Sequence, residues 1–210
     1  MGRSPLWPAE LSHGEVLLRP HLRSDRREYR EVRAANRDWL RPWEATVPDP
    51  LWARPGFAEM RRLSRASAKQ GRSLPFAIDI GGRFRGQLTV SGFEWGSLAA
   101  AHLGYWIDRR VAGRGYVPLA VALAVDHCFA AGLHRMEIAI RPENSASLRV
   151  ADKLGFRREG LRERYMHIDG DWRDHLIFSL LSEDVPFGLL HWHLRERERT
   201  ASPTFESGEG

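Results

Sequence analysis

The stretch Arg110-Val111-Ala112-Gly113-Arg114-Gly115-Tyr116 joins an apolar run typical of a strand, residues 103–107, to a longer apolar run typical of a helix. Such a turn directs unpaired backbone N–H groups and the positive end of the helix dipole at one point beyond the sheet. Glycine is needed at positions 113 and 115 because a Cβ atom would restrict the turn and hold a ligand off the backbone. The stretch therefore predicts a diphosphate site, with an ordinary strand-to-helix turn as the alternative.

The spacing of the glycines excludes two other phosphate-binding loops. A Walker loop ends in Gly-Lys-Ser/Thr, whereas Gly115 is followed by Tyr116 and Val117. A dinucleotide-binding fingerprint has a third glycine three residues after the second, and Pro118 stands there instead. The pattern that remains is Arg/Gln-x-x-Gly-x-Gly/Ala, which begins at Arg110.

A second motif, Arg141-Pro142-Glu143-Asn144-Ser145-Ala146-Ser147, follows an alternating run at residues 135–140 that is typical of a strand. It leads through an expected helix to Lys153-Leu154-Gly155-Phe156. Asn144 is a favoured N-cap, and Gly155 suits the left-handed position after a last helical turn. Either motif alone is weak evidence for a function, but the two in this order are strong evidence together.

The two motifs resemble those of the GCN5-related N-acetyltransferases, which hold the diphosphate of acetyl-coenzyme A on the first of them. Within that superfamily the chain resembles the ribosomal-protein N-terminal alanine acetyltransferases of the RimJ/RimL type. The resemblance covers roughly residues 14 to 183, and outside the two motifs it rests on residues 14–20, 36–40, 103–108, 158–163 and 169–174.

This resemblance implies a single α/β domain with a mixed, mostly antiparallel sheet that is flanked by helices and splayed between its fourth and fifth strands. Gly81-Gly82 and Asp169-Gly170 are hairpin signals that agree with this order. We expect an N-terminal extension over 1–13, the acetyltransferase domain over 14–183 and a C-terminal helix or disordered tail over 184–210. Residues 195–210 have few apolar positions and predict disorder.

The resemblance also implies acetyl-coenzyme A as the cofactor, and no metal. The pantetheine arm would pair with the free edge of residues 102–107 as an added strand does. The Asn144 side chain could cap its helix through the oxygen and bond the arm through its N–H groups. The residues expected to bind the cofactor are Tyr105, Trp106, Ile107, Arg110, Val111, Ala112, Gly113, Arg114, Gly115, Tyr116, Asn144 and Ser147.

The implied reaction is direct transfer of the acetyl group from the thioester to an amine. It requires loss of an amine proton, stabilisation of the carbonyl oxygen and protonation of the departing thiolate. Ser147 matches the family's Asn-x-x-Ser and is the expected acid, with a capping serine as the alternative. His102 stands where relatives commonly carry Glu and is the expected base, with a surface histidine as the alternative. Tyr165, Glu163 and His167 are rival bases.

The expected acceptor is the N-terminal α-amino group of a ribosomal or other cytosolic protein. An α-amino group titrates near pH 8 and a lysine near 10.4, so an N-terminus presents more neutral amine at pH 7. Trp39 and Trp43 are expected to wall the acceptor cleft, with Glu44 or Asp49 as partner of the ammonium. A polyamine, an aminoglycoside or a non-catalytic coenzyme A-binding module are the alternatives.

Composition agrees with a cytoplasmic enzyme that binds neither DNA nor membrane. The formal net charge is +5, but nearly all of the positive charge is arginine scattered among acidic neighbours, which does not form a nucleic-acid-binding stripe. No signal peptide and no apolar run of membrane-spanning length are evident. Cys128, the only cysteine, is expected to be a buried structural thiol. The expected oligomeric state is a monomer or a homodimer.

Overall fold

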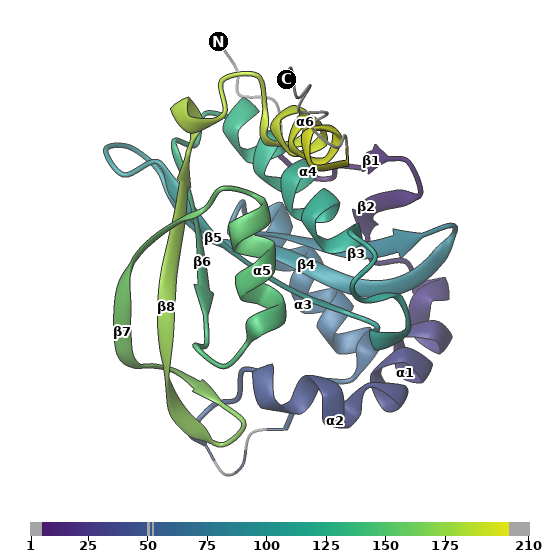
Figure 1. The fold of residues 1–210 in the computed structure, drawn as a ribbon. Helices are drawn as coiled ribbons and strands as arrows, with labels where there is room; N and C mark the ends of the chain where they lie inside the picture. The colour runs from purple at the N-terminus through teal and green to yellow at the C-terminus, as the bar shows by residue number, and fades with distance from the viewer. Residues whose placement is uncertain (1–5, 50, 52, 202–210) are drawn as a thin grey trace, which may run out of the picture.

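The computed structural model describes residues 6–49, 51 and 53–201, and in this part of the chain eight strands form one sheet with helices on both faces (Figure 1). The strands are β1 (Leu11–His13), β2 (Val16–Pro20), β3 (Ser73–Ile80), β4 (Arg83–Glu94), β5 (Ala100–Ile107), β6 (Arg135–Ile140), β7 (Arg157–Ile168) and β8 (Asp171–Leu181). The α-helices are α1 (Arg26–Ala35), α2 (Arg37–Leu40), α3 (Phe57–Lys69), α4 (Tyr116–Ala130), α5 (Ser145–Lys153) and α6 (Leu189–Ala201). Short 3-10 helices occupy Arg23–Asp25, Arg41–Trp43, Arg109–Val111 and Ser182–Asp184.

The sheet is mixed, with the strand order β1-β2-β3-β4-β5-β6-β8-β7. Every pairing in the described chain is antiparallel except that of β5 with β6, which α4 connects. A parallel pair needs a crossover connection of this kind, and α4 supplies it. The expected α/β fold with a mostly antiparallel sheet is confirmed.

The sheet splays between β5 and β6. The two strands pair over only three residues, from Ala100 opposite Arg135 to His102 opposite Glu137. Beyond that point residues 103–107 pair with β4 on one side and, among the described residues, with no strand on the other. The predicted splay is thus present; its fourth and fifth strands are β5 and β6 here, because the N-terminal strand β1 adds one to the numbering. Helix α5 lies next to β6 at the splay (Figure 1).

Two helical layers cover the sheet. α4 is apolar on nearly all sides because it packs between the sheet on one side and α6 on the other (Figure 1). On the opposite face α1 packs against β4, and α3 against β3. Cys128 of α4 is fully buried, and this burial raises the pKa of its thiol to about 12, so it is a structural residue.

Both predicted hairpins are present, since Gly81-Gly82 and Asp169-Gly170 join β3 to β4 and β7 to β8. The N-terminal segment adds β1, which pairs with β2. The prediction of disorder is wrong for residues 195–201, because α6 continues to Ala201; the helix packs against α4 and buries Leu189 and His193. The rest of the predicted tail, 202–210, and residues 1–5 of the extension lie outside the described residues, and the predicted domain boundaries stay predictions.

Candidate active site

A cleft of about 600 Å³ opens at the splay between β5 and β6. Its walls are formed by four parts of the chain: the end of β5, the loop before α4, the start of α5, and the segment after α1 that contains Trp39 and Trp43 (the Trp-containing segment). Of the residues singled out from sequence, it brings together Tyr105, Trp106, Ile107, Val111, Ala112, Gly113, Gly115, Tyr116, Asn144, Ser147, Trp39 and Trp43. Arg110, Arg114, His102, Tyr165 and Glu44 do not line it.

The loop before α4 has the backbone of an anion cradle. Gly113 and Gly115 have φ angles of +78° and +86°, a region in which only glycine is free of strain. Their N–H groups and that of Arg114 donate to no acceptor in the described chain. The first N–H groups of α4 cannot bond within the helix. A Cβ on Gly113 would meet no protein atom within 4 Å, so the space above the loop is open to a ligand.

The buried side chain of Asp108 holds this loop in place. It is fully buried, and its carboxylate accepts hydrogen bonds from Asn36 at 3.0 Å, from Arg85 at 3.2 Å and from the backbone N–H of Arg110 at 3.1 Å. The Arg110 side chain pairs with the same carboxylate at 2.7 Å instead of facing the cleft. Burial would raise the pKa of Asp108, but the hydrogen bonds from Arg110 and Asn36 outweigh it and lower the pKa. Arg110 therefore holds the loop in shape.

The start of α5 forms the opposite wall. The Asn144 Oδ1 atom accepts a hydrogen bond from the Ser147 backbone N–H at 3.1 Å and so caps the helix. The Asn144 N–H groups donate to no acceptor in the described chain, which leaves them available to a ligand in the cleft.

Tyr105 crosses the floor of the cleft toward Ser147. Its hydroxyl is buried and lies beside the Ser147 hydroxyl, the side-chain group that opposes the effect of burial on it. Burial raises the pKa of Tyr105 to about 12, against a smaller opposing effect of the Ser147 hydroxyl. The phenol therefore stays protonated at neutral pH, which makes it a second candidate proton donor beside Ser147; sequence reasoning had placed it only as a cofactor contact.

Three cations line the cleft that sequence reasoning did not single out: Arg109, Arg149 and Lys153. Arg149 and Lys153 are four residues apart on α5 and so lie on one face of the helix. Neither forms an ion pair in the described chain, and Arg109 stacks over the Trp39 ring at 5.4 Å. The i, i+4 spacing after Asn144 was the signal in the sequence that could have found the pair on α5.

The expected base His102 and its rivals Tyr165, Glu163 and His167 do not line the cleft. His102 is 42% exposed at the last paired position of β5, with its Nδ1 atom 3.4 Å from the Glu137 carboxylate. Strand alternation places it on the same face as Trp106 and opposite Tyr105. Tyr165 lies on β7, where its hydroxyl accepts a hydrogen bond from Arg162 at 2.9 Å. A catalytic role of either residue stays a prediction.

Hydrogen bonds connect the Trp-containing segment to the β7–β8 hairpin. The Thr46 N–H donates to the His167 carbonyl at 2.9 Å, and the two side chains bond at 2.8 Å. Arg141 stacks over the Trp43 ring at 5.4 Å and donates to the Pro42 carbonyl at 2.7 Å. These contacts hold the segment in place as a wall of the cleft.

Glu44 belongs to this segment but faces away from the cleft. Its carboxylate pairs with Arg33 and, at 3.0 Å, with Arg54. Binding of an acceptor ammonium by Glu44 would therefore have to compete with two arginines.

The chain belongs to the acetyltransferase (GNAT) family, whose model matches residues 15–157, and it is an acyltransferase of the N-acetyltransferase type. It is similar to the probable N-acetyltransferase YjcK of Bacillus subtilis, with 30% identity over 80% of this chain and 95% of that protein. It is 29% identical to the [ribosomal protein uS5]-alanine N-acetyltransferase of Escherichia coli over 72% of this chain and 79% of that one. The structure of Mycobacterium smegmatis RimJ in complex with CoA-disulfide superposes with a TM-score of 0.86 and 37% identity, covering 93% of this chain and 97% of that one. The expected RimJ/RimL resemblance is confirmed.

Two further features bear on the site. In the residues that the structure describes, no group of three or more His, Cys, Asp or Glu side chains is arranged to hold a metal ion. No helix of that part is long and apolar enough to cross a membrane.

Proposed function

We propose that this protein transfers the acetyl group of acetyl-coenzyme A to the N-terminal α-amino group of a cytosolic protein, a ribosomal protein first among them. The cleft at the splay carries the proposal, because it combines an anion cradle, a free strand edge and the buried Tyr105 hydroxyl beside Ser147 in one place. The similarity to the uS5-alanine acetyltransferase and to RimJ supports the acceptor class.

The chain offers a suitable partner for each part of the cofactor. The free N–H groups around Gly113 and Gly115 suit the diphosphate, together with the cations Arg149 and Lys153. The open edge of β5 and the amide of Asn144 suit the pantetheine amides. The cofactor, when bound, supplies a thioester whose acyl carbon is open to attack by an amine.

Protein groups then serve the charges that develop during the transfer. A backbone N–H on the unpaired part of β5 stabilises the carbonyl oxygen as it becomes anionic. Ser147 or Tyr105 donates a proton to the departing sulfur, and the buried phenol of Tyr105 keeps that proton available at neutral pH. His102 is the proposed base for the acceptor amine, directly or through water.

The charge of the cleft favours a peptide over a polyamine or an aminoglycoside. Among the described lining residues the one carboxylate is Glu143, and Arg141 already pairs with it at 3.2 Å. An acceptor with several positive charges would therefore find few partners near the splay, whereas an α-amino group enters in its neutral form more readily than lysine.

Mass spectrometry of acetyl transfer to a peptide panel tests this proposal. The panel contains the N-terminal sequence of ribosomal protein uS5 with a free α-amino group, the same peptide with a formyl-blocked N-terminus and an internal lysine, spermidine and kanamycin. We expect acetylation of the free N-terminus alone. Acetylation of spermidine or kanamycin in preference would overturn the acceptor, and coenzyme A binding without any turnover would favour the non-catalytic module.

A further inference from the structure

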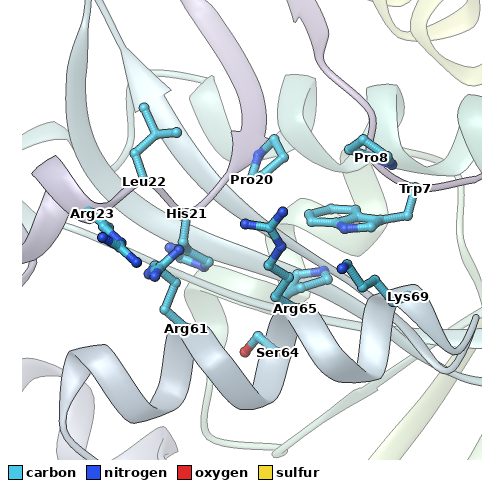
Figure 2. Close-up of a pocket in the computed structure, with 11 residues that line it drawn as sticks. Trp7, Pro8, Pro20, His21, Leu22, Arg23, Arg61, Ser64, Arg65 and Lys69 are labelled. Carbon is cyan, nitrogen blue, oxygen red and sulfur yellow. The ribbon is translucent and has the colours of Figure 1, made fainter.

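A second cavity, of about 430 Å³, lies on the α3 side of the sheet and shares no lining residue with the acetyltransferase cleft. The N-terminal segment, the turn after β2, α3 and the start of β3 enclose it. In Figure 2, Arg61, Ser64, Arg65 and Lys69 project from one face of α3 toward this space, and Trp7 and Pro8 approach from the other side.

The lining is cationic and carries no carboxylate. Arg23, Arg61, Arg65 and Lys69 contribute four positive charges, and none of them forms an ion pair in the part of the chain that the structure describes. Arg62, on the same helix but outside the cavity, does form an ion pair, with Glu59 at 3.8 Å. Like charges four residues apart on a helix repel each other, so an anion in this cavity would relieve a repulsion present in the free protein.

His21 adds an unsatisfied polar group to the same space. Only 7% of this residue is exposed, yet neither ring nitrogen has a hydrogen-bond partner in the described chain. Burial is the main cause that lowers the pKa of His21 to about 4. The charge of Asp25 opposes this shift, and the charges of Arg19 and Arg61 add to it. A neutral imidazole has one N–H donor, and leaving it buried without an acceptor costs free energy that a ligand oxygen would recover.

Apart from Ser64, the remainder of the lining is apolar, and most of it is made of rings. Trp7, Pro8, Pro20 and Pro75 supply ring surfaces, and Trp7 is held against Phe76 with ring centroids 5.6 Å apart. A ligand that uses the whole cavity therefore carries a flat or aliphatic body as well as a charge. A bare inorganic anion would leave this surface unused, and the concave shape differs from the extended basic stripe that binds nucleic acid.

We propose that this cavity is a binding site for a small organic anion, with a carboxylate or phosphate head held by Arg61, Arg65 and Lys69 and an apolar ring against Trp7. The Arg23 guanidinium and the His21 N–H complete the polar end. The ligand is separate from the acetyl donor and from the acceptor amine, because no residue of this cavity faces the cleft at the splay.

Calorimetry on the full chain saturated with coenzyme A tests the proposal, since the acetyltransferase cleft is then filled. Phenyl phosphate and benzoate distinguish the two head groups, and inorganic phosphate and benzyl alcohol provide the head and the body alone. We expect at least one aromatic anion to bind more tightly than either partial ligand. The double variant Arg61→Gln/Arg65→Gln should lose about tenfold or more in affinity.

Arg62→Gln is the matched control, because it removes the same charge from the same helix outside the cavity. Trp7→Ala should weaken phenyl phosphate but leave inorganic phosphate unchanged. Ring resonances of His21 should shift on binding in the wild type. No binding of either aromatic anion, equal affinity in the double variant and the control, or binding of an oligonucleotide in their place would overturn the proposal.

Discussion

The Asn36 side chain donates from Nδ2 to Asp108 Oδ1 at 3.0 Å and accepts at Oδ1 from the Arg109 backbone N–H at 2.8 Å. This buried residue at the end of α1 thereby connects the helix to the loop that we propose to bind the cofactor. Two elements that are distant in the sequence are thus held in one geometry, and the loop is supported by a residue that does not line the cleft.

Asn36→Ala should therefore weaken both the fold and the cofactor site. The substitution removes three hydrogen bonds and leaves the Asp108 carboxylate with one donor fewer, at a cost of about 2 kcal/mol in the free energy of unfolding. Affinity for coenzyme A should fall as well, because Arg109 and Arg110 lose their support. Urea unfolding and calorimetry check the two effects, and unchanged affinity in a destabilised protein would show that the loop holds its shape without Asn36.

Gly113→Glu and Gly115→Glu should each abolish coenzyme A binding. Either change places bulk and negative charge where the diphosphate approaches the backbone, and each also strains a residue with positive φ. Gly96→Glu is the matched control, since Gly96 has a φ of +85° with nothing within 4 Å of an added Cβ and lies in the loop at the other end of β5. Calorimetry on all three separates loss of the site from backbone strain, and retained affinity in the first two variants would reduce the loop to an ordinary turn.

Ser147→Ala and Tyr105→Phe should lower kcat more than they weaken coenzyme A binding, because each removes a proton donor from the floor of the cleft. Asn144→Ala should do the reverse, since it removes a cap and an expected contact to the pantetheine arm. Steady-state kinetics with coenzyme A affinities measured in parallel separates the two patterns. If one of the two variants keeps full turnover, the other residue is the proton donor. If the double variant Ser147→Ala/Tyr105→Phe keeps full turnover, neither residue donates the proton.

The sequence was sufficient for the cofactor loop and the start of α5 because both are local: their glycines, caps and spacing are read within a few residues. The Asn36–Asp108 contact was not predictable, since it joins residues 72 positions apart that are unremarkable by themselves. The same limit applies to Tyr105 and Ser147, which meet only when β5 and α5 face each other. The full length of β7, Arg157–Ile168, was not predictable from the sequence either, because its pairing with β8 has two register shifts and charged residues fill the exposed strand.

Glu159 should make the stability depend on acid pH. The pKa of Glu159 is lowered from 4.5 to about 2, mainly because its carboxylate accepts a hydrogen bond from Arg135. A second hydrogen bond, from the Ser179 hydroxyl at 2.6 Å, adds to this effect. Because the folded-state pKa lies below the unfolded one, the ionised group stabilises the fold above pH 4.5 and this contribution is lost as pH falls toward 2. Glu159→Gln should cost about 1 kcal/mol at pH 7, and the difference from wild type should shrink between pH 5 and pH 3.

Urea unfolding across that range measures this difference. Glu163→Gln is the control, since Glu163 is exposed on the same strand without an ion pair in the described chain. A difference for Glu159→Gln that stays constant with pH would contradict the linkage.

His102 provides the most demanding prediction. If it accepts the proton of the acceptor amine, kcat/KM should rise with pH along a limb that vanishes in His102→Ala. His102→Glu should restore part of the rate with the limb moved toward acid, because a carboxylate at the same place accepts the proton with a lower pKa. His134→Ala is the control, since His134 is also half exposed with a carboxylate 3.0 Å away, that of Glu183, but lies in the loop before β6 and not on β5.

The acceptor amine titrates in a neighbouring range and could imitate the limb, so the profile must be repeated with an acceptor whose amine has a clearly different pKa. A limb that follows the acceptor and ignores residue 102 would remove His102 as the base. Strand alternation places His102 on the face of β5 opposite Tyr105, which is a candidate proton donor to sulfur beside the expected acid Ser147. Proton removal from the amine and proton delivery to the sulfur would then come from opposite faces of β5, and Tyr165 and Glu163 on β7 would be examined next if His102 fails.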